Sequence, residues 1–298
     1  MRHWTLGLIG LWAAGAVAQT APPAAPPNAP APPKTDELVV TGRRAPDKAE
    51  LRRQVDGVAG HPGFDKPLAR FIEPVCLGTM GLGADTGAAI LDRMVQVAEA
   101  ARVPMNGKAT CSPNVLVLFI DDSHAGVERI AKRTSGLMRS LSYYEVKALL
   151  KEPGPVYAWS AVETRSRDGD RMAVDFPGDV PQLKVSTATR TALPIRQDML
   201  SSVVIIERKA VAGKLVTQIA DYAAMRAFAE TKPRRKGDAA TILSLFDEGV
   251  VAPVEMTAFD RGYLRGVYSG APNQLPGFQI GGMARAIGEE MIKEDAGP

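Results

Sequence analysis

The stretch SVVIIERKAVAGKLVTQIADYAAMRAFAE, residues 202–230, decides the fold. It begins with a continuous run of β-branched residues at 203–206, which is typical of a buried strand. Beyond this run, apolar residues recur at spacings of three and four, which predicts a helix over residues 212–230. A buried strand that leads directly into a long helix indicates an architecture in which helices pack against a sheet.

Further elements follow on both sides of this stretch. Before it, we expect strands at residues 71–77, 115–120, 156–165 and 171–175, and helices at 85–101, 123–141 and 143–150. Residues 78–83 predict a flexible loop, residues 167–170 a hairpin turn, and residues 176–200 a long loop. After it, we expect three short helices at 239–247, 257–268 and 278–293. The predicted fold class is α/β (α+β): a mixed twisted sheet packed against helices, with an all-helical C-terminal segment.

The first 18 residues have the features of a cleavable secretory signal peptide. Arg2 and His3 give a basic start, an apolar stretch follows, and Ala16-Val17-Ala18 matches a small-x-small cleavage site. The apolar stretch is shorter than the roughly 20 residues that a membrane span requires. We therefore expect cleavage near Ala18 and a mature chain that is periplasmic or secreted, with no transmembrane segment.

Residues 19–47 predict a disordered linker, because residues 19–34 are almost entirely alanine and proline and offer no apolar face to bury. Within the linker, the segment from Glu37 to Arg44 resembles the one that follows the signal peptide in many TonB-dependent outer-membrane receptors. The resemblance covers eight residues, and an isolated apolar patch in a linker is the simpler interpretation. We expect a single globular α/β domain over residues 48–298.

The composition excludes some classes of partner. Hydrophobic residues make up 45% and charged residues 23% of the chain, and the net charge is +3. These values are ordinary for globular proteins. A nucleic-acid-binding protein needs a clustered basic face, so we expect no nucleic-acid partner. A protein or peptide partner stays open.

The two cysteines, Cys76 and Cys111, predict a disulfide, since an even count in an oxidising compartment favours pairing. The alternative is two buried thiols that are not bonded to each other. Neither cysteine has a second cysteine or a pair of histidines at the spacing of a metal site.

Two other patterns have structural explanations that need no ligand. Gly78, Gly81, Gly83 and Gly87 follow a candidate strand, but their spacing differs from the dinucleotide fingerprint and no P-loop lysine accompanies them. Asp121, Asp122 and His124 could bind a metal, yet such residues at a helix start are also ordinary caps. His61 lies in a glycine-rich linker. We therefore expect no cofactor and no metal.

The closing part of the chain carries a family resemblance. Thr257 and Asp260 predict a capping box, and Tyr263, Leu264 and Tyr268 follow on one apolar helix face. This helix resembles the closing helix in the catalytic domain of zincin-type metallopeptidases. The order of elements over residues 71–270 is also similar to the zincin core. The resemblance implies a degenerate zincin-type scaffold in a family of exported bacterial proteins.

The sequence departs from that family where zinc would bind. In place of His-Glu-x-x-His the helix reads QIADY, so Gln218 and Tyr222 stand where the histidines would be, with an isoleucine at the position of the base. Zinc requires imidazole ligands and a carboxylate that takes the water proton. The helix is therefore interpreted as structural, with Tyr222 toward the core and Asp221 and Arg226 facing out or pairing locally.

Three functional hypotheses follow. The first is an exported non-catalytic protein of the periplasm or cell envelope that binds a protein or peptide, or has a structural role, on a peptidase-like scaffold. The second is a secreted hydrolase with an unrecognised site, for which Asp221, Tyr222 and His124 are the candidate catalytic residues. The third is a TonB-linked accessory protein that engages through Glu37 to Arg44.

Overall fold

The computed structural model describes residues 47–60, 63, 65–108, 110–132, 136–185, 189–232 and 239–296. The expected signal peptide, the linker up to residue 46, the segment from Glu37 to Arg44, and His61 lie outside these residues.

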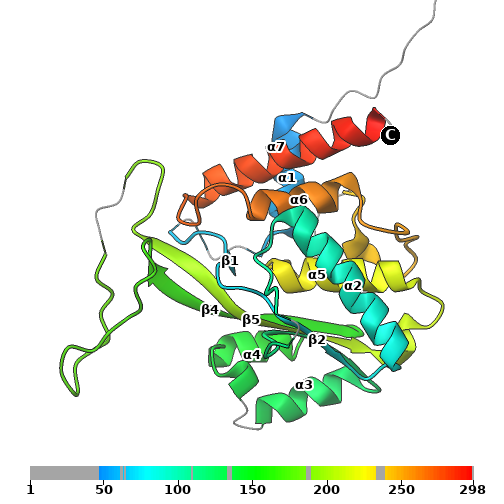
Figure 1. Ribbon diagram of the computed structural model, residues 1–298, viewed down its shortest axis with the longest axis horizontal. Helices are drawn as coiled ribbons and strands as arrows, with labels where there is room; N and C mark the ends of the chain where they lie inside the picture. The colour runs from blue at the N-terminus through cyan, green and yellow to red at the C-terminus, as the bar shows by residue number, and fades with distance from the viewer. Residues whose placement is uncertain are drawn as a thin grey trace, which may run out of the picture. The chain divides into compact units, whose positions relative to one another are not determined.

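The apolar run at residues 203–206 belongs to the long strand β5 (Ile195–Glu207), which is the centre of the sheet. The other strands are β1 (Arg70–Phe71), β2 (Leu77–Met80), β3 (Val115–Ile120) and β4 (Val156–Ser166). β5 pairs in parallel with β3 and, through its first half, with β1, and β3 pairs in parallel with β2. β4 pairs antiparallel with β5. Within the described residues β5 is its one partner, so β4 is an edge strand (Figure 1).

Helices cover both faces of the sheet (Figure 1). On one face lie α2 (Ala84–Ala101), α5 (Val216–Phe228) and α6 (Ala258–Val267), with α7 (Pro276–Asp295) and α1 (Lys48–Val58) beyond them. On the other face lie α3 (Ser123–Lys132) and α4 (Tyr143–Leu149).

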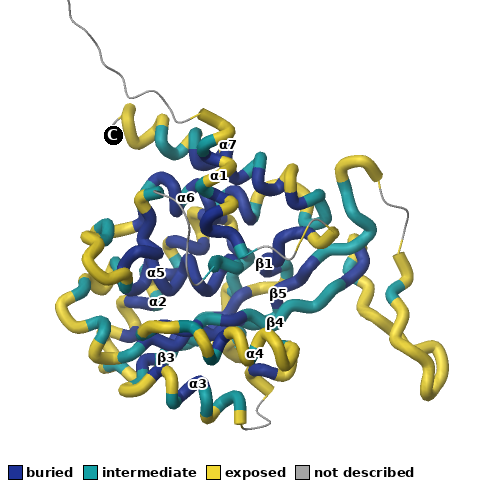
Figure 2. Tube along the Cα trace, turned by 180° about the vertical axis from the view of Figure 1, so that it is seen from behind, coloured by how far each residue is buried: buried dark blue, intermediate teal, exposed yellow. Residues whose placement is uncertain are grey.

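The alternation of side chains along β5 explains the two cores. Val204 and Ile206 are buried in the larger cluster with α2, α5 and α6, whereas Val203 and Ile205 are buried in the smaller cluster beside α3 and α4. Successive side chains of a strand point to opposite faces, so an unbroken apolar run requires cover on both. Figure 2 shows α5 as a largely buried segment. The predicted mixed α/β fold class is confirmed.

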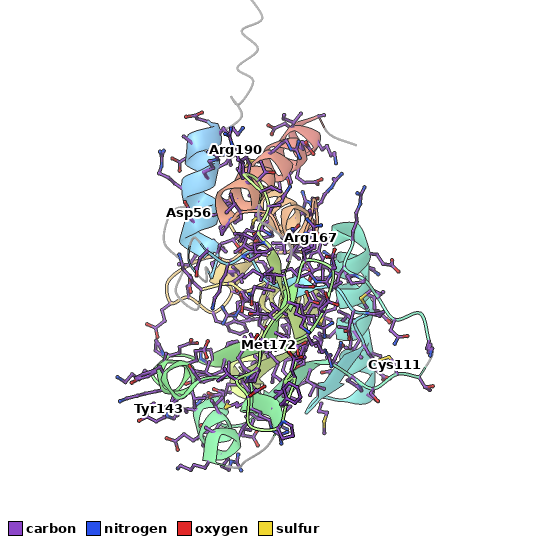
Figure 3. All side chains as sticks on the ribbon, turned by 90° about the vertical axis from the view of Figure 1, so that its left-hand side faces the viewer. Asp56, Cys111, Tyr143, Arg167, Met172 and Arg190 are labelled. Carbon is purple, nitrogen blue, oxygen red and sulfur yellow. A yellow bond between two sulfur atoms is a disulfide. The ribbon has the colours of Figure 1, made fainter. Side chains whose placement is uncertain are left out.

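The predicted hairpin at residues 167–170 is wrong. The strand that pairs with β4 is β5, and the described residues between them, 167–185 and 189–194, form an exposed arm in which Ala173 bridges Gln182 (Figures 1 and 2). Arg167, Met172 and Arg190 mark this arm in Figure 3. The loop predicted at residues 176–200 therefore ends earlier, because β5 begins at Ile195. The sequence did not predict that β5 begins here, because its first residues include the charged side chains of Arg196 and Asp198, which form an ion pair with each other in the sheet.

Several helix boundaries also differ from the prediction. The helix expected over 123–141 ends at Lys132, and a 3-10 turn follows at Gly136–Met138. The helix expected at 239–247 is a 3-10 turn at Ile242–Ser244. Between β5 and α5 lies another 3-10 turn, Arg208–Val211. Gly78, expected in a flexible loop, lies in β2 opposite Leu116.

The predicted Cys76–Cys111 disulfide is confirmed. The two Cα atoms are 6.0 Å apart, within the usual range for the bond, and Figure 3 labels Cys111. The bond ties the segment before β2 to the segment before β3, two strands that pair in parallel. None of the helices described is long and apolar enough to cross a membrane.

Candidate functional site

Gln218, expected at the position of a zinc-binding histidine, has a structural role at the start of α5. Its side-chain oxygen accepts a hydrogen bond from the backbone nitrogen of Leu215 at 3.1 Å. Its side-chain nitrogen donates to the carbonyl of Pro253 at 2.7 Å. Both ends of the amide are therefore occupied in capping the helix and holding the loop that leads to α6.

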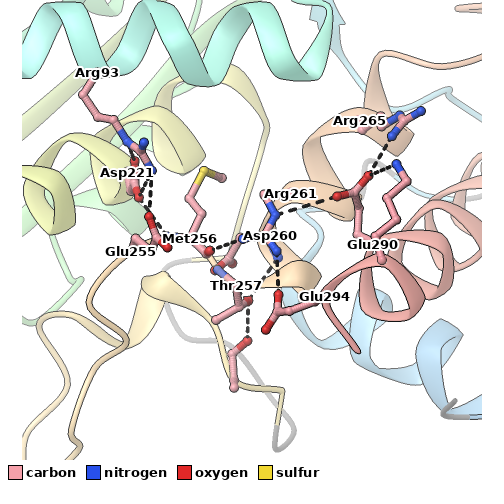
Figure 4. Close-up of polar contacts among 12 residues, drawn as sticks. Arg93, Asp221, Glu255, Met256, Thr257, Asp260, Arg261, Arg265, Glu290 and Glu294 are labelled. Atoms are coloured by element: carbon pink, nitrogen blue, oxygen red, sulfur yellow. Dashed lines mark hydrogen bonds and ion pairs between the residues drawn. The ribbon is translucent and has the colours of Figure 1, made fainter. Parts of the chain in front are cut away.

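Asp221 is fully buried, which corrects the expectation that it faces out. Arg93 of α2 donates to its carboxylate with Nε at 2.7 Å and Nη2 at 3.0 Å, and the backbone nitrogen of Met256 donates at 2.8 Å (Figure 4). The bond to Asp221 raises the pKa of Arg93. Glu255 lies 3.5 Å from Nη2 of the same arginine. Asp221 therefore fastens α5 to α2 and to the start of α6.

Tyr222 fills space in the core, as the sequence predicted. It is 7% exposed and packs edge-on against Phe246, with 4.8 Å between ring centroids. Burial raises the pKa of its phenol, so the ring is neutral at any physiological pH.

His124 lies on the opposite face of the sheet, at the start of α3. Its Nδ1 is 3.0 Å from the hydroxyl of Tyr157, and its Nε2 is 3.6 Å from Glu128. Asp221 and Tyr222 belong to α5 on the other side of the sheet. The three candidate catalytic residues are therefore not brought together. Asp122 caps α3 through the backbone nitrogen of Ala125 at 2.9 Å. Among the described residues, no group of acidic, histidine or cysteine side chains is arranged as a metal site.

The structure instead reveals a cleft of about 430 Å³ at the open edge of β4. This volume is within the range of small-molecule and cofactor sites, about 300–1,000 Å³. Its walls come from four parts of the chain: α4 and the loop after it, the middle of β4, the end of α5 with the residues that follow, and the end of the α1 segment. The lining residues are Gly60, Glu145, Glu152, Ala158, Trp159, Ser160, Arg226, Ala229, Glu230, Thr231 and Lys232.

The cleft exposes the edge of β4 rather than one of its faces. Three consecutive residues, 158–160, line it, although successive side chains of a strand alternate between faces. Moreover Glu145 on α4 and Arg226 on α5, from opposite faces of the sheet, both contribute to the lining. The opposite wall, residues 230–232, is also extended: Thr231 bridges Ala59 antiparallel, and Lys232 donates its backbone N–H to Val58 at 2.8 Å.

Three carboxylates line the cleft, and two of them have no side-chain partner in the described structure. Burial, together with the negative charge of Glu145, raises the pKa of Glu230 to about 7, and no hydrogen bond or ion pair holds its carboxylate. Burial also raises the pKa of Glu152, against the lowering effect of Arg226, and its Oε2 is buried without a hydrogen-bond partner. The carboxylate of Glu145 accepts from the backbone nitrogen of Ser142 at 2.6 Å, as part of the α4 capping box.

The two cationic side chains of the cleft are committed to backbone carbonyls. Arg226 is buried, and its Nη1 donates to the carbonyls of Thr231 at 3.0 Å and Lys232 at 3.1 Å, and to the Thr231 hydroxyl at 3.1 Å. The ammonium group of Lys232 donates to the carbonyl of Asp56. The Nε of Arg226 is buried without a partner. These cations shape the wall, and neither neutralises a carboxylate through a direct ion pair.

Sequence reasoning missed Glu152 and Glu230 because neither belongs to a motif. Each follows closely on apolar residues at the end of a helix, Glu152 after Leu149 and Leu150, and Glu230 after Phe228 and Ala229. That position is the only signal, since the elements that bring them together are distant in sequence.

No protein family, no curated protein and no solved structure matches this chain. The assignment of function therefore depends on the geometry of the cleft.

Proposed function

We propose that this protein is an exported, non-catalytic binding protein of the periplasm or cell envelope that holds an extended peptide segment along the open edge of β4. The observation that carries the proposal is the cleft itself, which is lined by the edge of β4 and by a second extended segment, residues 230–232. Five charged side chains of the described residues also line it.

The physical reason is the hydrogen-bonding capacity of a strand edge. An edge strand carries backbone N–H and C=O groups with no neighbour, and these groups bind an additional strand readily. An extended peptide in this cleft would pair with β4 on one side and lie against residues 230–232 on the other. Main-chain pairing supplies affinity in such complexes, and the surrounding side chains supply specificity.

The Cys76–Cys111 bond supports export, since disulfides persist in oxidising compartments, and the signal peptide predicted from the sequence agrees with it. The likeness to a degenerate zincin scaffold stays part of the proposal. Its support is that the helix after the last strand is used for packing, with Gln218 and Asp221 held by structural hydrogen bonds.

Tryptophan fluorescence gives a direct test. The chain has three tryptophans, Trp4, Trp12 and Trp159, and Trp159 lines the cleft. In the full chain carrying Trp4→Phe and Trp12→Phe, an acetylated peptide of alternating threonine and valine should change the emission of Trp159 with a saturable dependence on concentration. The same peptide with N-methyl groups on alternate backbone nitrogens should bind much more weakly. Equal binding of the methylated peptide, or no binding of either, would contradict strand pairing.

A second candidate function is hydrolysis with Glu230 as the proton donor. The observation that favours it is a carboxylate whose pKa is raised to about 7 in a cleft that is also lined by a second carboxylate whose pKa is raised. Such pairs occur in enzymes that use general acid and base catalysis. Mass spectrometry of peptides and oligosaccharides after prolonged incubation with the protein, and with Glu230→Gln as the control, tests it. Cleavage that disappears in the variant would favour the hydrolase over the binding protein.

A further inference from the structure

We propose that the cleft selects peptides by a positively charged side chain, lysine or arginine, which enters it and pairs with Glu152 and Glu230. This inference rests on the proposed peptide-binding function and adds a specificity to it. Glu152 and Glu230 would be the specificity-determining residues, and the edge of β4 would hold the peptide backbone.

The balance of committed and uncommitted charge carries the argument. Both cations of the cleft, Arg226 and Lys232, donate to backbone carbonyls of the wall. The side chain of Glu230, by contrast, makes no hydrogen bond or ion pair within the described residues, and one oxygen of Glu152 is buried without a partner. Glu145 adds a third negative charge. Glu152 and Glu230 therefore keep carboxylate oxygens that can accept hydrogen bonds from a ligand.

Burial makes this an incomplete arrangement. A charged group removed from water without a partner costs free energy, which a bound cation offsets. The Nε of Arg226, a side chain 7% exposed, is also buried without a partner, so the wall has an unsatisfied donor as well. A peptide carries both kinds of complement, an ammonium or guanidinium group for the carboxylates and carbonyl oxygens for a donor.

The size and composition of the cleft favour a side chain over a bare cation. A volume of about 430 Å³ is far larger than a metal ion needs. No metal-site grouping of side chains occurs among the residues described. The lining also contains apolar surface from Ala158 and Ala229, against which the methylene groups of lysine or arginine would pack.

The probe is a set of short peptides of alternating threonine and valine, acetylated and amidated so that the central residue supplies the only charge. The central residue is lysine, arginine, norleucine or glutamate. Binding is followed through Trp159 in the full chain carrying Trp4→Phe and Trp12→Phe. We expect the lysine and arginine peptides to bind about 10-fold or more tighter than the norleucine peptide, the usual effect of a hydrogen bond to a charged group. The glutamate peptide should bind most weakly.

Variants identify the residues responsible. Glu152→Gln and Glu230→Gln keep the size of each side chain, and each should reduce the preference for lysine over norleucine. Glu289→Gln removes an exposed carboxylate on α7 and should leave the preference unchanged. The double variant Glu152→Lys/Glu230→Lys should prefer the glutamate peptide. If it does not fold, judged by circular dichroism, the glutamine variants decide.

The outcomes separate the two proposals. Equal affinity for all four peptides would overturn the charge selectivity and leave strand pairing at β4 in place. A lysine preference that both glutamine variants retain would place the selecting charge elsewhere and overturn this inference. If none of the peptides binds, both the selectivity and the proposed function fail.

Discussion

Two acidic side chains near opposite ends of α5 have opposite surroundings. Asp221, in the second turn, is fully buried and accepts hydrogen bonds from Arg93 and from the backbone of Met256 (Figure 4). The side chain of Glu230, just beyond the last turn, lines the cleft and makes no hydrogen bond or ion pair in the part of the chain that the structure describes, and its pKa is raised to about 7. The carboxylate that stood out in the sequence serves the fold, and the one that did not stand out is available to a ligand.

The difference between Asp221 and Glu230 shows how to separate carboxylates that stabilise the fold from carboxylates that can bind a ligand. Burial with a full set of partners stabilises the charge and leaves it nothing further to bind. Burial in a cleft without partners raises the pKa of a carboxylate. Such a carboxylate can still transfer a proton or bind a cation, so it is often part of a functional site. Loss of Asp221 should therefore weaken the fold, whereas loss of Glu230 should change the cleft and what it binds.

The largest expected effect is the loss of Asp221. Asp221→Ala leaves Arg93 and the backbone nitrogen of Met256 without their acceptor. Breaking a buried ion pair by removing one partner should lower the free energy of unfolding by about 3 kcal/mol. Denaturant unfolding followed by circular dichroism measures it. Asp221→Asn keeps an acceptor for Met256 and should cost less.

If Asp221 serves only the fold, its loss should not change the affinity for a peptide. At temperatures where Asp221→Ala is folded, its affinity for the lysine peptide should stay within about twofold of the parent, since distant sites are usually independent. A large loss of affinity together with a small loss of stability would reverse the roles assigned to the two carboxylates.

The second largest effect is expected on the free energy of unfolding of the protein without a bound peptide. The pKa of Glu230 in the folded protein, about 7, lies above its ordinary value of 4.5, so folding favours the protonated form. Ionisation therefore costs stability as the pH rises from about 4.5 through about 7, and the cost is constant above that. Removing this charge with Glu230→Gln should raise the free energy of unfolding by about 2 kcal/mol at pH 8.

The same variant should change little at about pH 4, where the carboxyl is protonated in both folded and unfolded chains. Unfolding curves of parent and variant at the two pH values give the comparison. The negative charge of Glu145 acts on Glu230, and burial together with Glu230 raises the pKa of Tyr263. Glu152, Arg226 and Lys232 are the other charged residues that line the cleft. A variant that is less stable than the parent at pH 8 would mean that Glu230 is paired in solution.

A smaller effect is expected on binding. Because a cationic side chain pairs best with the ionised form, the affinity for the lysine peptide should increase as the pH rises through about 7, by about 10-fold between pH 5 and pH 8. The increase should be much reduced in Glu230→Gln. The norleucine peptide, which has no charge to pair, serves as the control and should bind with little dependence on pH. Tighter binding at low pH would contradict a role for the ionised carboxylate.

Local patterns predicted much of the fold. The β-branched run at residues 203–206 lies in the central strand, because an apolar run with no polar interruption requires cover on both faces. Thr257 and Asp260 form the predicted capping box, with each side chain accepting from the other's backbone nitrogen at 3.3 and 3.0 Å. The cysteine pair could be predicted from its even count.

Elements defined by distant partners were missed. The start of β5 contains Arg196 and Asp198, which are polar in sequence but 2.9 Å apart in a buried ion pair. β1 has two residues, and its identity as a strand comes only from pairing with β5. The cleft was missed for the same reason, because Glu152, Glu230 and the edge of β4 come together only after the sheet and helices have packed.

The smallest expected effect is that of His124, the third candidate catalytic residue of the sequence. Its side chain is 52% exposed, and its contact with Glu128 is an exposed pair of the kind that contributes little. Its one link to the cleft runs through Tyr157, whose hydroxyl is 3.0 Å from Nδ1 and donates to the carbonyl of Glu152 at 3.1 Å. Tyr157 is buried and keeps that bond without the imidazole. His124→Ala should therefore change the free energy of unfolding by less than about 0.5 kcal/mol, as surface substitutions usually do, and leave peptide affinity and its pH dependence unaltered. A clear loss of affinity in this variant, with Tyr157→Phe showing the same loss, would mean that the His124–Tyr157 contact positions Glu152, and the site would then extend to the start of α3.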